Sequence, residues 1–213
     1  MQHEKGLYGV LAKGRIYDSL QRLLGGSKAK RWLATHFWRC RKGEKVVDMG
    51  CGTGECLRYL PSGIRYVGFD LSEAYVREAR RKHGNDDASF LVGTAEDFLA
   101  GNEHPLSDAD AVLCTGLLHH LDEQESIRLL QLARNIMAPS GRFLCYEPTY
   151  LVHQSRLSKR ITGMDRGRNV RTEDEWKQLF APIFPSFKSN LVTNLLRIPY
   201  HCILIECRNS SED

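Results

Sequence analysis

Short apolar runs alternate with segments of helical periodicity through the middle of the chain. The apolar runs lie near residues 46–49, 65–70, 89–92, 109–115 and 142–146. Their length and composition are typical of strands that are buried on both faces of a parallel sheet. Helical segments separate most of these runs, and this alternation of strands with helices predicts an α/β domain.

Capping residues indicate where several helices begin. Ser72 is a candidate N-cap for a helix that continues to about residue 83. Asp122 with Glu125, and Thr172 with Glu175, have the spacing of capping boxes, in which each residue bonds the backbone of the other. We therefore expect two further helices that end near residues 137 and 180.

The two ends of the chain complete the expected domain. Apolar runs at 187–192 and 201–207 predict an antiparallel edge pair, which brings the mostly parallel sheet to seven strands. Residues 1–14 are expected to form a loop or lid, and the spacing within 15–38 predicts two helices separated by a Gly-Gly-Ser turn. Residues 148–171 are polar and basic, and we expect an ordered but irregular insertion over the site.

The first apolar run ends in an acid and is followed by alternating glycines. Asp48 precedes Gly50, Gly52 and Gly54, and glycine permits both a sharp turn and the close approach of a ligand to the backbone. N–H groups at the start of the next helix favour an electron-rich ligand. The second run ends in Asp70, twenty residues after Gly50, where a carboxylate can bind both hydroxyls of a ribose. The glycine spacing differs from G-x-G-x-x-G, so a dinucleotide oxidoreductase is the weakest functional hypothesis.

These residues resemble a known family. Asp-Met-Gly-Cys-Gly-Thr-Gly (48–54), followed by Gly-Phe-Asp-Leu-Ser (68–72), resembles the first two motifs of class I S-adenosylmethionine-dependent methyltransferases. The resemblance continues through residues 93–98, 110–121 and 138–142, so that it covers about residues 45–147 in the family's order. It implies a Rossmann-like three-layer α/β sandwich of the small bacterial type, which binds S-adenosyl-L-methionine and releases S-adenosyl-L-homocysteine (SAH).

The resemblance also implies which residues bind this cofactor. They are Asp48, Gly50, Cys51 and Gly52 in the glycine loop, Asp70 and Leu71 after the second strand, Ala95 and Glu96 beside the adenine, Thr115 at the end of the fourth strand, and Tyr8 in the N-terminal cover. The whole chain, 1–213, is expected to be a single domain. Its parts are a helical cap (1–44), a cofactor-binding core (45–147), a basic lid insertion (148–171), and a C-terminal helix with a strand pair (172–213).

Methyl transfer sets modest demands on side chains. The methyl group of a sulfonium is already activated, so the enzyme mainly aligns the acceptor and excludes water. A general base is needed only when the acceptor arrives protonated. The candidate bases are His119, His120 and Glu147, and the resemblance favours His120 as the inward histidine. The alternative is that the histidine pair only shapes the loop after the fourth strand.

The candidate acceptor-binding residues are Tyr150, Arg166, Arg168 and Arg171. A guanidinium binds phosphate or carboxylate through forked hydrogen bonds, which favours an anionic acceptor. The alternative for these arginines is internal pairing with acids of the same segment.

The charge is divided along the 213 residues. Residues 1–45 hold eleven basic against three acidic residues, 46–152 hold nine against sixteen, and 153–213 hold ten against seven. Basic flanks attract an anionic substrate, nucleic acid or a membrane surface, although they can also be ordinary solvated faces. The seven cysteines are mostly in predicted strands, which indicates reduced thiols and no metal site. We find neither a secretion signal nor a long apolar run, and we expect a cytoplasmic protein without a membrane span.

Three functions remain after these observations. The leading hypothesis is a methyltransferase that acts by in-line displacement on a small, anionic metabolite. The first alternative is an RNA methyltransferase, which the basic flanks favour, although no appended RNA-binding module or base-flipping motif is present, so nucleic acid is an unlikely partner. The second alternative is a non-catalytic protein that binds the cofactor and regulates a partner. The sequence does not indicate an oligomeric state.

Overall fold

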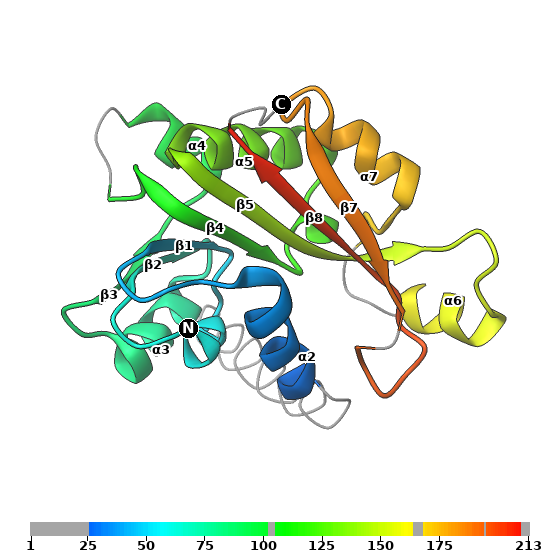
Figure 1. Cartoon of the computed structure of the whole chain (residues 1–213), viewed down its shortest axis with the longest axis horizontal. Coiled ribbons are helices and arrows are strands. Elements are labelled where there is room, and N and C mark those ends of the chain that lie inside the picture. Colours follow the sequence, from blue (N-terminus) through cyan, green and yellow to red (C-terminus); the bar gives the residue numbers. More distant parts are fainter. Residues whose placement is uncertain (1–25, 102–104, 164–167, 194, 210–213) are drawn as a thin grey trace, which may run out of the picture.

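The computed structural model describes residues 26–101, 105–163, 168–193 and 195–209, and its centre is a single sheet (Figure 1). The strands are β1 Lys45–Met49, β2 Arg65–Asp70, β3 Ala88–Val92, β4 Ala109–Thr115, β5 Met137–Tyr150, β6 Arg171–Thr172, β7 Phe187–Val192 and β8 Cys202–Arg208. Their order is β3-β2-β1-β4-β5-β8-β7, and the short β6 pairs with β5. β8 is antiparallel to both of its neighbours, as predicted for the C-terminal pair. The predicted seven strands are confirmed, with β6 as an addition.

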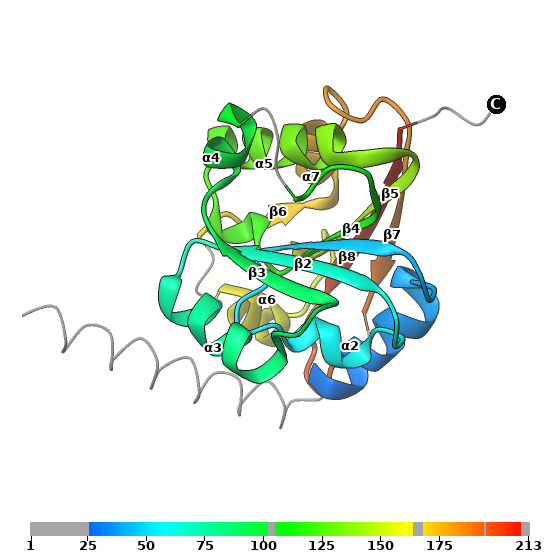
Figure 2. The same cartoon turned by 90° about the vertical axis from the view of Figure 1, so that its left-hand side faces the viewer.

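Helices cover both faces of the sheet, which gives three layers (Figure 2). One face carries α4 Ala95–Ala100, α5 Glu123–Ile136 and α7 Glu173–Phe180, whereas the other carries α2 Gly26–Leu33, the π-helical turn Ala34–Trp38 and α3 Glu73–His83. Each face has its own apolar core. One core contains Leu130 and Trp176, and the other contains Trp38 and Val76. The predicted three-layer α/β class is confirmed.

The capping residues position the helices as predicted. The Ser72 hydroxyl accepts from the N–H of Tyr75 at the start of α3. Asp122 and Glu125 form the reciprocal capping box of α5. Thr172 with Glu175 does the same for α7. Local sequence therefore determines these helix starts, since the caps satisfy backbone donors that have no partner in the first turn.

The segment after β5 is more regular than its sequence indicates. It contains α6, Arg156–Gly163, whose buried face carries Ser158 and Thr162 in place of aliphatic side chains. The Gln154 side-chain amide donates to the hydroxyls of Ser158 (2.8 Å) and Thr162 (3.1 Å). Hydrophobic periodicity could not reveal this helix, because polar hydrogen bonds attach it to the preceding turn.

The strand order reverses between β1 and β4. Ligands of open α/β sheets bind outside the carboxyl ends of the strands at such a switch point, and this is where the glycine loop and the loop after β4 meet. α2 and the π-helical turn correspond to the second of the two predicted N-terminal helices. The predicted loop at 1–14, the first N-terminal helix and Tyr8 lie outside the described residues. Within the described part of the chain, no helix is both long and apolar enough to cross a membrane. The division of the chain into four parts stays a prediction.

Candidate functional site

The glycine loop follows β1 at the switch point. Gly50, Gly52 and Gly54 have φ angles of 68°, 54° and 77°, a region that side-chain-bearing residues rarely adopt. A Cβ at Gly50 would come within 2.8 Å of the Leu117 side chain, whereas a Cβ at Gly52 would meet nothing within 4 Å. The loop is therefore packed against the post-β4 loop at its first glycine and open to a ligand at its second. The contact with Leu117 carries no sequence signal, because it joins two loops far apart in the chain.

Most described N–H groups of this loop are already engaged. The N–H of Cys51 donates to Phe69 O, that of Gly52 to Asp70, and that of Gly54 to Cys51 O. Cys51 is also buried, and its side chain packs onto Gly68 of the neighbouring strand. These three N–H groups therefore already have acceptors, and Cys51 packs on the buried side of the loop. The next helix begins at Glu55, and ligand binding by the N–H groups at its start stays a prediction.

Asp70 connects the glycine loop to helix α3. One carboxylate oxygen accepts from the N–H of Gly52 at 3.0 Å and the other from the N–H of Ser72 at 2.8 Å. The residue is partly exposed at the carboxyl end of β2, and the side chain of Leu71 beside it is 72% exposed. This geometry fits the ribose and adenosine roles predicted for both residues.

Asp48 lies beneath the loop rather than at its surface. Its side chain is buried, and the hydroxyl of Tyr66 donates to its Oδ2 at 2.6 Å. Burial raises the pKa of Asp48 to about 6, and the hydrogen bond from Tyr66 offsets part of that effect. The predicted direct contact of this side chain with a cofactor does not fit a buried carboxylate. The sequence did not identify Tyr66 as its partner, since a tyrosine in an apolar strand has the pattern of a core residue.

The turn after β3 begins helix α4. Thr94 and Asp97 form its capping box, in which the N–H of Thr94 donates to Asp97 at 2.8 Å. Ala95 packs against the core, and the Glu96 side chain is exposed, 3.9 Å from the guanidinium of Arg128. Ala95 and Glu96 therefore remain available for the adenine contact that the sequence predicts.

A buried glutamate holds the loop after β4. Oε1 of Glu147 accepts from the N–H groups of Leu117 and Leu118, both at 2.8 Å. Oε2 of Glu147 accepts from the N–H of His119 at 3.4 Å, and the Nδ1 of His119 lies 2.6 Å from it. A fully buried carboxylate with these contacts cannot reach an acceptor, so the predicted catalytic role of Glu147 is corrected to support of the loop. Its position near the carboxyl end of β5 could have indicated a nearby site, but not this set of donors.

The two histidines face different surroundings. His119 is buried against Glu147, whereas His120 is exposed at the same edge, with the two ring centroids 4.0 Å apart. His120, the residue that the resemblance favours, is thus the exposed one of the pair, and its contact with an acceptor stays a prediction. His120 and Thr115, at the partly exposed end of β4, remain candidates for contact with ligands.

Arg171 belongs to the support of the same loop. Its guanidinium lies 4.8 Å from the Trp176 ring centroid, and its Nη1 donates to the carbonyl oxygens of Leu118 (3.4 Å) and Asn169 (3.2 Å). The N–H of Asn169 in turn donates to His119 O at 3.0 Å. Burial lowers the pKa of Arg171. The alternative of internal bonding thus holds for Arg171, although its partners are carbonyls rather than acids.

The other predicted acceptor residues are more exposed or are not described. Arg168 is exposed, and Tyr150 is partly exposed at the end of β5. A Cβ at Gly163 would lie 3.7 Å from the Tyr150 hydroxyl, which places that hydroxyl beside the last turn of α6. Arg166 lies outside the described residues. The structure therefore brings Tyr150 close to the segment predicted to cover the site.

Two thiols lie beside the supporting glutamate. The side chains of Cys114, Cys145 and Glu147 place one potential metal-ligating atom each within 4.8 Å of one another, and all three are buried. Both oxygens of Glu147 already take part in the contacts described above, which opposes metal binding. Burial raises the pKa of Cys145 well above its usual value, so this thiol stays protonated at neutral pH.

Comparison with known proteins identifies the family of the chain. A model of the methyltransferase domain matches residues 18–182. The chain is 24% identical over 160 residues to the demethylmenaquinone methyltransferase of Symbiobacterium thermophilum, an alignment that covers 68% of this chain and 59% of that protein. It is 32% identical over 106 residues to the fatty-acid O-methyltransferase of Mycolicibacterium smegmatis, which covers 48% of this chain and 36% of that protein.

The fold is similar to that of a solved complex. The plantazolicin methyltransferase BamL, bound to SAH and a triazolic desmethylPZN analog, superposes with a TM-score of 0.64 at 15% identity, over 97% of this chain and 91% of that one. This likeness concerns the fold alone, whereas the family model matches well over half of the sequence. The chain belongs to the methyltransferase domain family of class I S-adenosylmethionine-dependent methyltransferases.

Proposed function

We propose that this protein transfers the methyl group of S-adenosylmethionine to a small-molecule acceptor. The observation that carries the proposal is the pairing of Gly52 with Asp70 at the switch point of the sheet. Gly52 has open space on its Cβ side, and the exposed Leu71 lies next to Asp70. These features provide room for a nucleoside above a carboxylate that can accept from its ribose hydroxyls.

The chain's own residues have three tasks in this mechanism. S-adenosylmethionine supplies an activated methyl group when it is bound, so little covalent chemistry is left to the protein. Asp70 orients the ribose, and the loop at 117–120, supported by Glu147, delimits the methionine end of the site. His120 accepts the proton of an acceptor that arrives as a hydroxyl or an amine. With the cofactor held beside Asp70 and Gly52, its sulfonium would supply the methyl group for in-line displacement by the acceptor, and SAH would leave.

We further propose that the acceptor is anionic. The exposed Arg168 and the basic residues of the post-β5 segment support this, because guanidinium groups bind carboxylates and phosphates. The fatty-acid O-methyltransferase is named for an anionic amphiphile. Since the chain spans only 36% of that relative and 59% of the demethylmenaquinone methyltransferase, neither acceptor is assigned to this protein.

Two measurements test the proposal. The first is calorimetric titration with S-adenosylmethionine and SAH. The second is transfer of a labelled methyl group to a panel of acids, phosphates, neutral lipids and RNA. We expect binding of both cofactor forms and transfer to anionic small molecules. Binding without transfer to any member of the panel would favour a non-catalytic role. Transfer to RNA alone would contradict the small-molecule acceptor, and the absence of binding would contradict the cofactor site.

A further inference from the structure

The large hydrophobic side chains that are exposed follow the carboxyl ends of the strands, along the width of the sheet. Among the described residues, five large hydrophobic side chains are exposed, namely Leu71, Val92, Val152, Leu157 and Leu191. Leu71 follows β2, Val92 ends β3, and Val152 follows β5. Leu191 lies near the end of β7, which runs parallel to β5 because both are antiparallel to β8. These four therefore lie at or beyond the carboxyl ends of their strands, and Leu157 lies in α6, which follows β5.

Two of these side chains extend further than a ligand pocket requires. Val152 is 93% exposed in the turn after β5, and Leu157 is 62% exposed in the first turn of α6. The Gln154 hydrogen bonds hold the buried side of α6, and Leu157 on its outer face is exposed among the residues that the structure describes. Val152 and Leu157 lie in one short segment, and exposed hydrophobic side chains that lie together mark a surface that binds a partner.

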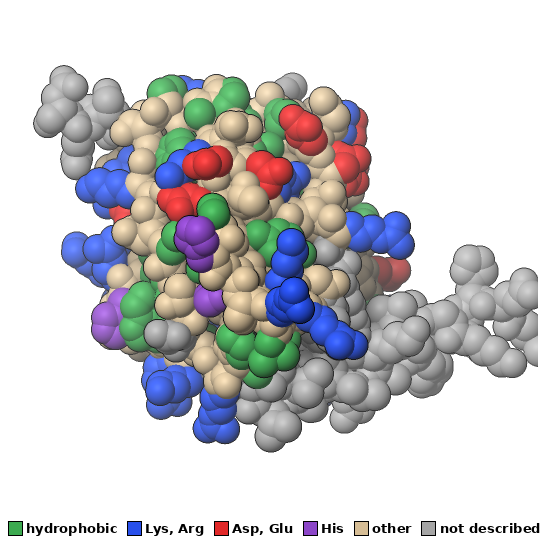
Figure 3. Space-filling model, turned by 90° about the vertical axis from the view of Figure 1, so that its right-hand side faces the viewer, with side chains coloured by type: hydrophobic (Ala, Val, Ile, Leu, Met, Phe, Trp, Pro, Cys, Tyr) green, Lys and Arg blue, Asp and Glu red, His purple; other side chains and the backbone are tan. Residues whose placement is uncertain are grey.

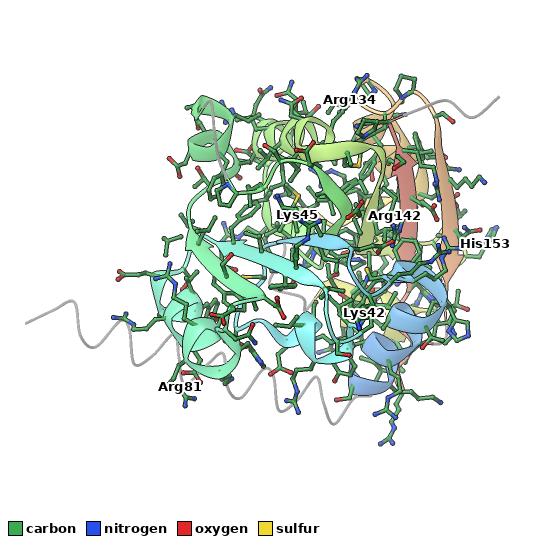
Figure 4. The ribbon with its side chains drawn as sticks, turned by 60° about the vertical axis from the view of Figure 1, so that its left-hand side comes forward. Lys42, Lys45, Arg81, Arg134, Arg142 and His153 are labelled. Atoms are coloured by element: carbon green, nitrogen blue, oxygen red, sulfur yellow. The ribbon has the colours of Figure 1, made fainter. Side chains whose placement is uncertain are left out.

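The same segment is basic. Arg156, Lys159 and Arg160 of α6 are exposed, and the sequence from 151 to 163 contains no acidic residue. Figure 3 looks onto this side of the molecule and shows lysine and arginine side chains beside exposed hydrophobic ones, with acidic side chains mainly higher in the view. In Figure 4, His153 of the same segment lies at the margin of the molecule, away from Arg81 of α3. The partner of this surface is therefore anionic and offers apolar contact.

The charge and the side-chain types select one partner class. A second copy of the chain, related by a two-fold axis, would place this basic surface against itself and bring like charges together. Single-stranded nucleic acid is bound through aromatic stacking, which Val152 and Leu157 cannot provide. Basic residues next to projecting aliphatic ones are the combination that binds the headgroup region of an anionic bilayer. We propose that α6 and the turn before it dock onto an anionic membrane surface, with Val152 and Leu157 entering the headgroup region.

Docking goes beyond the proposed methyl transfer and does not depend on it. The test is co-sedimentation of the full chain with vesicles of phosphatidylcholine, with and without phosphatidylglycerol. We expect partition into the anionic vesicles to be at least about tenfold stronger and to weaken as salt is raised. Replacement of Arg156, Lys159 and Arg160 by glutamine should lower it about fivefold per charge. The double variant Val152→Ser/Leu157→Ser should lower it about tenfold or more.

Matched controls use α3, which lies at the other end of the sheet's width from α6 (Figure 1). A variant of α3 removes the same number of charges from an exposed helical face by changing Arg77, Arg81 and Lys82 to glutamine. It should leave partition into the vesicles unchanged. Val92→Ser is the control for the hydrophobic pair. Equal effects of the α3 and α6 variants would overturn the proposal, as would full binding by the serine pair. Equally tight binding to soluble poly-glutamate would also overturn it and point to an acidic protein partner.

Discussion

The Nδ1 of His119 lies 2.6 Å from Oε2 of Glu147, and both side chains are buried. The same carboxylate accepts from three consecutive backbone N–H groups, those of Leu117, Leu118 and His119. A side chain at the end of β5 thus determines the backbone of the loop after β4. Leu117 in that loop packs over Gly50, so the glycine loop and the post-β4 loop form one supported unit.

Glu147→Gln should loosen this loop. The amide replaces one acceptor oxygen by a donor that faces backbone N–H groups, and breaking buried charge-assisted bonds costs about 3 kcal/mol. Urea unfolding should show that loss, and hydrogen exchange at residues 117–119 should accelerate more than elsewhere. Glu175→Gln, which weakens an exposed helix cap, is the control and should cost less than about 1 kcal/mol. Unchanged exchange at 117–119 would contradict the support role.

His120→Ala should lower turnover without changing cofactor affinity. A general base contributes about 10²–10⁴-fold to rate, and His120 is exposed at the carboxyl edge of the sheet, whereas His119 is buried against Glu147. The measurement is kcat with the identified acceptor, beside the SAH dissociation constant from calorimetry. His36→Ala, in an exposed helical position away from the switch point, is the control. An unaltered kcat would exclude His120 as the base and leave alignment as the main task of the loop.

Asp70→Ala should weaken binding of S-adenosylmethionine and SAH by about 1–3 kcal/mol, the cost of losing hydrogen bonds to a charged group. Its carboxylate also fixes Gly52 and Ser72, so the variant loses the orientation of the loop together with the ribose contact. Calorimetry measures the affinity, and thermal unfolding shows whether the fold is intact. Glu73→Ala, three residues later at the start of α3, should bind as the wild type does. Equal affinities of the Asp70 and Glu73 variants would rule out the ribose assignment.

Local signals in the sequence predicted the elements, whereas long-range contacts determine the roles of the side chains. Strand periodicity and capping pairs such as Asp122 with Glu125 act within a few residues, so sequence inspection located them. Sequence inspection missed helix α6, because Ser158 and Thr162 occupy its buried face, where apolar residues would have shown helical periodicity. The corrections at the site have a similar origin. Asp48 and Glu147 are acids at strand ends, which favours ligand binding, yet each is turned inward by a partner distant in the chain.

Asp48 should make stability depend on pH. Its folded pKa of about 6 lies above the usual value of 3.8, so the folded state keeps this proton when the unfolded chain has lost it. Stability therefore falls as pH rises between these values, by roughly 3 kcal/mol at about 1.4 kcal/mol per pKa unit, and the loss is complete above pH 6.

Asp48→Asn removes this dependence. Urea unfolding measured from acidic to neutral pH should show that the free energy of unfolding of the variant rises relative to that of the wild type as pH rises. Asp97, whose pKa is lowered by hydrogen bonds from Thr94, is the control of opposite sign: Asp97→Asn should lose stability relative to the wild type as pH rises towards 3.8, and the difference should stay constant over the range in which Asp48 acts. If the Asp48→Asn and wild-type curves run parallel, the buried carboxylate titrates alike in the folded and unfolded states.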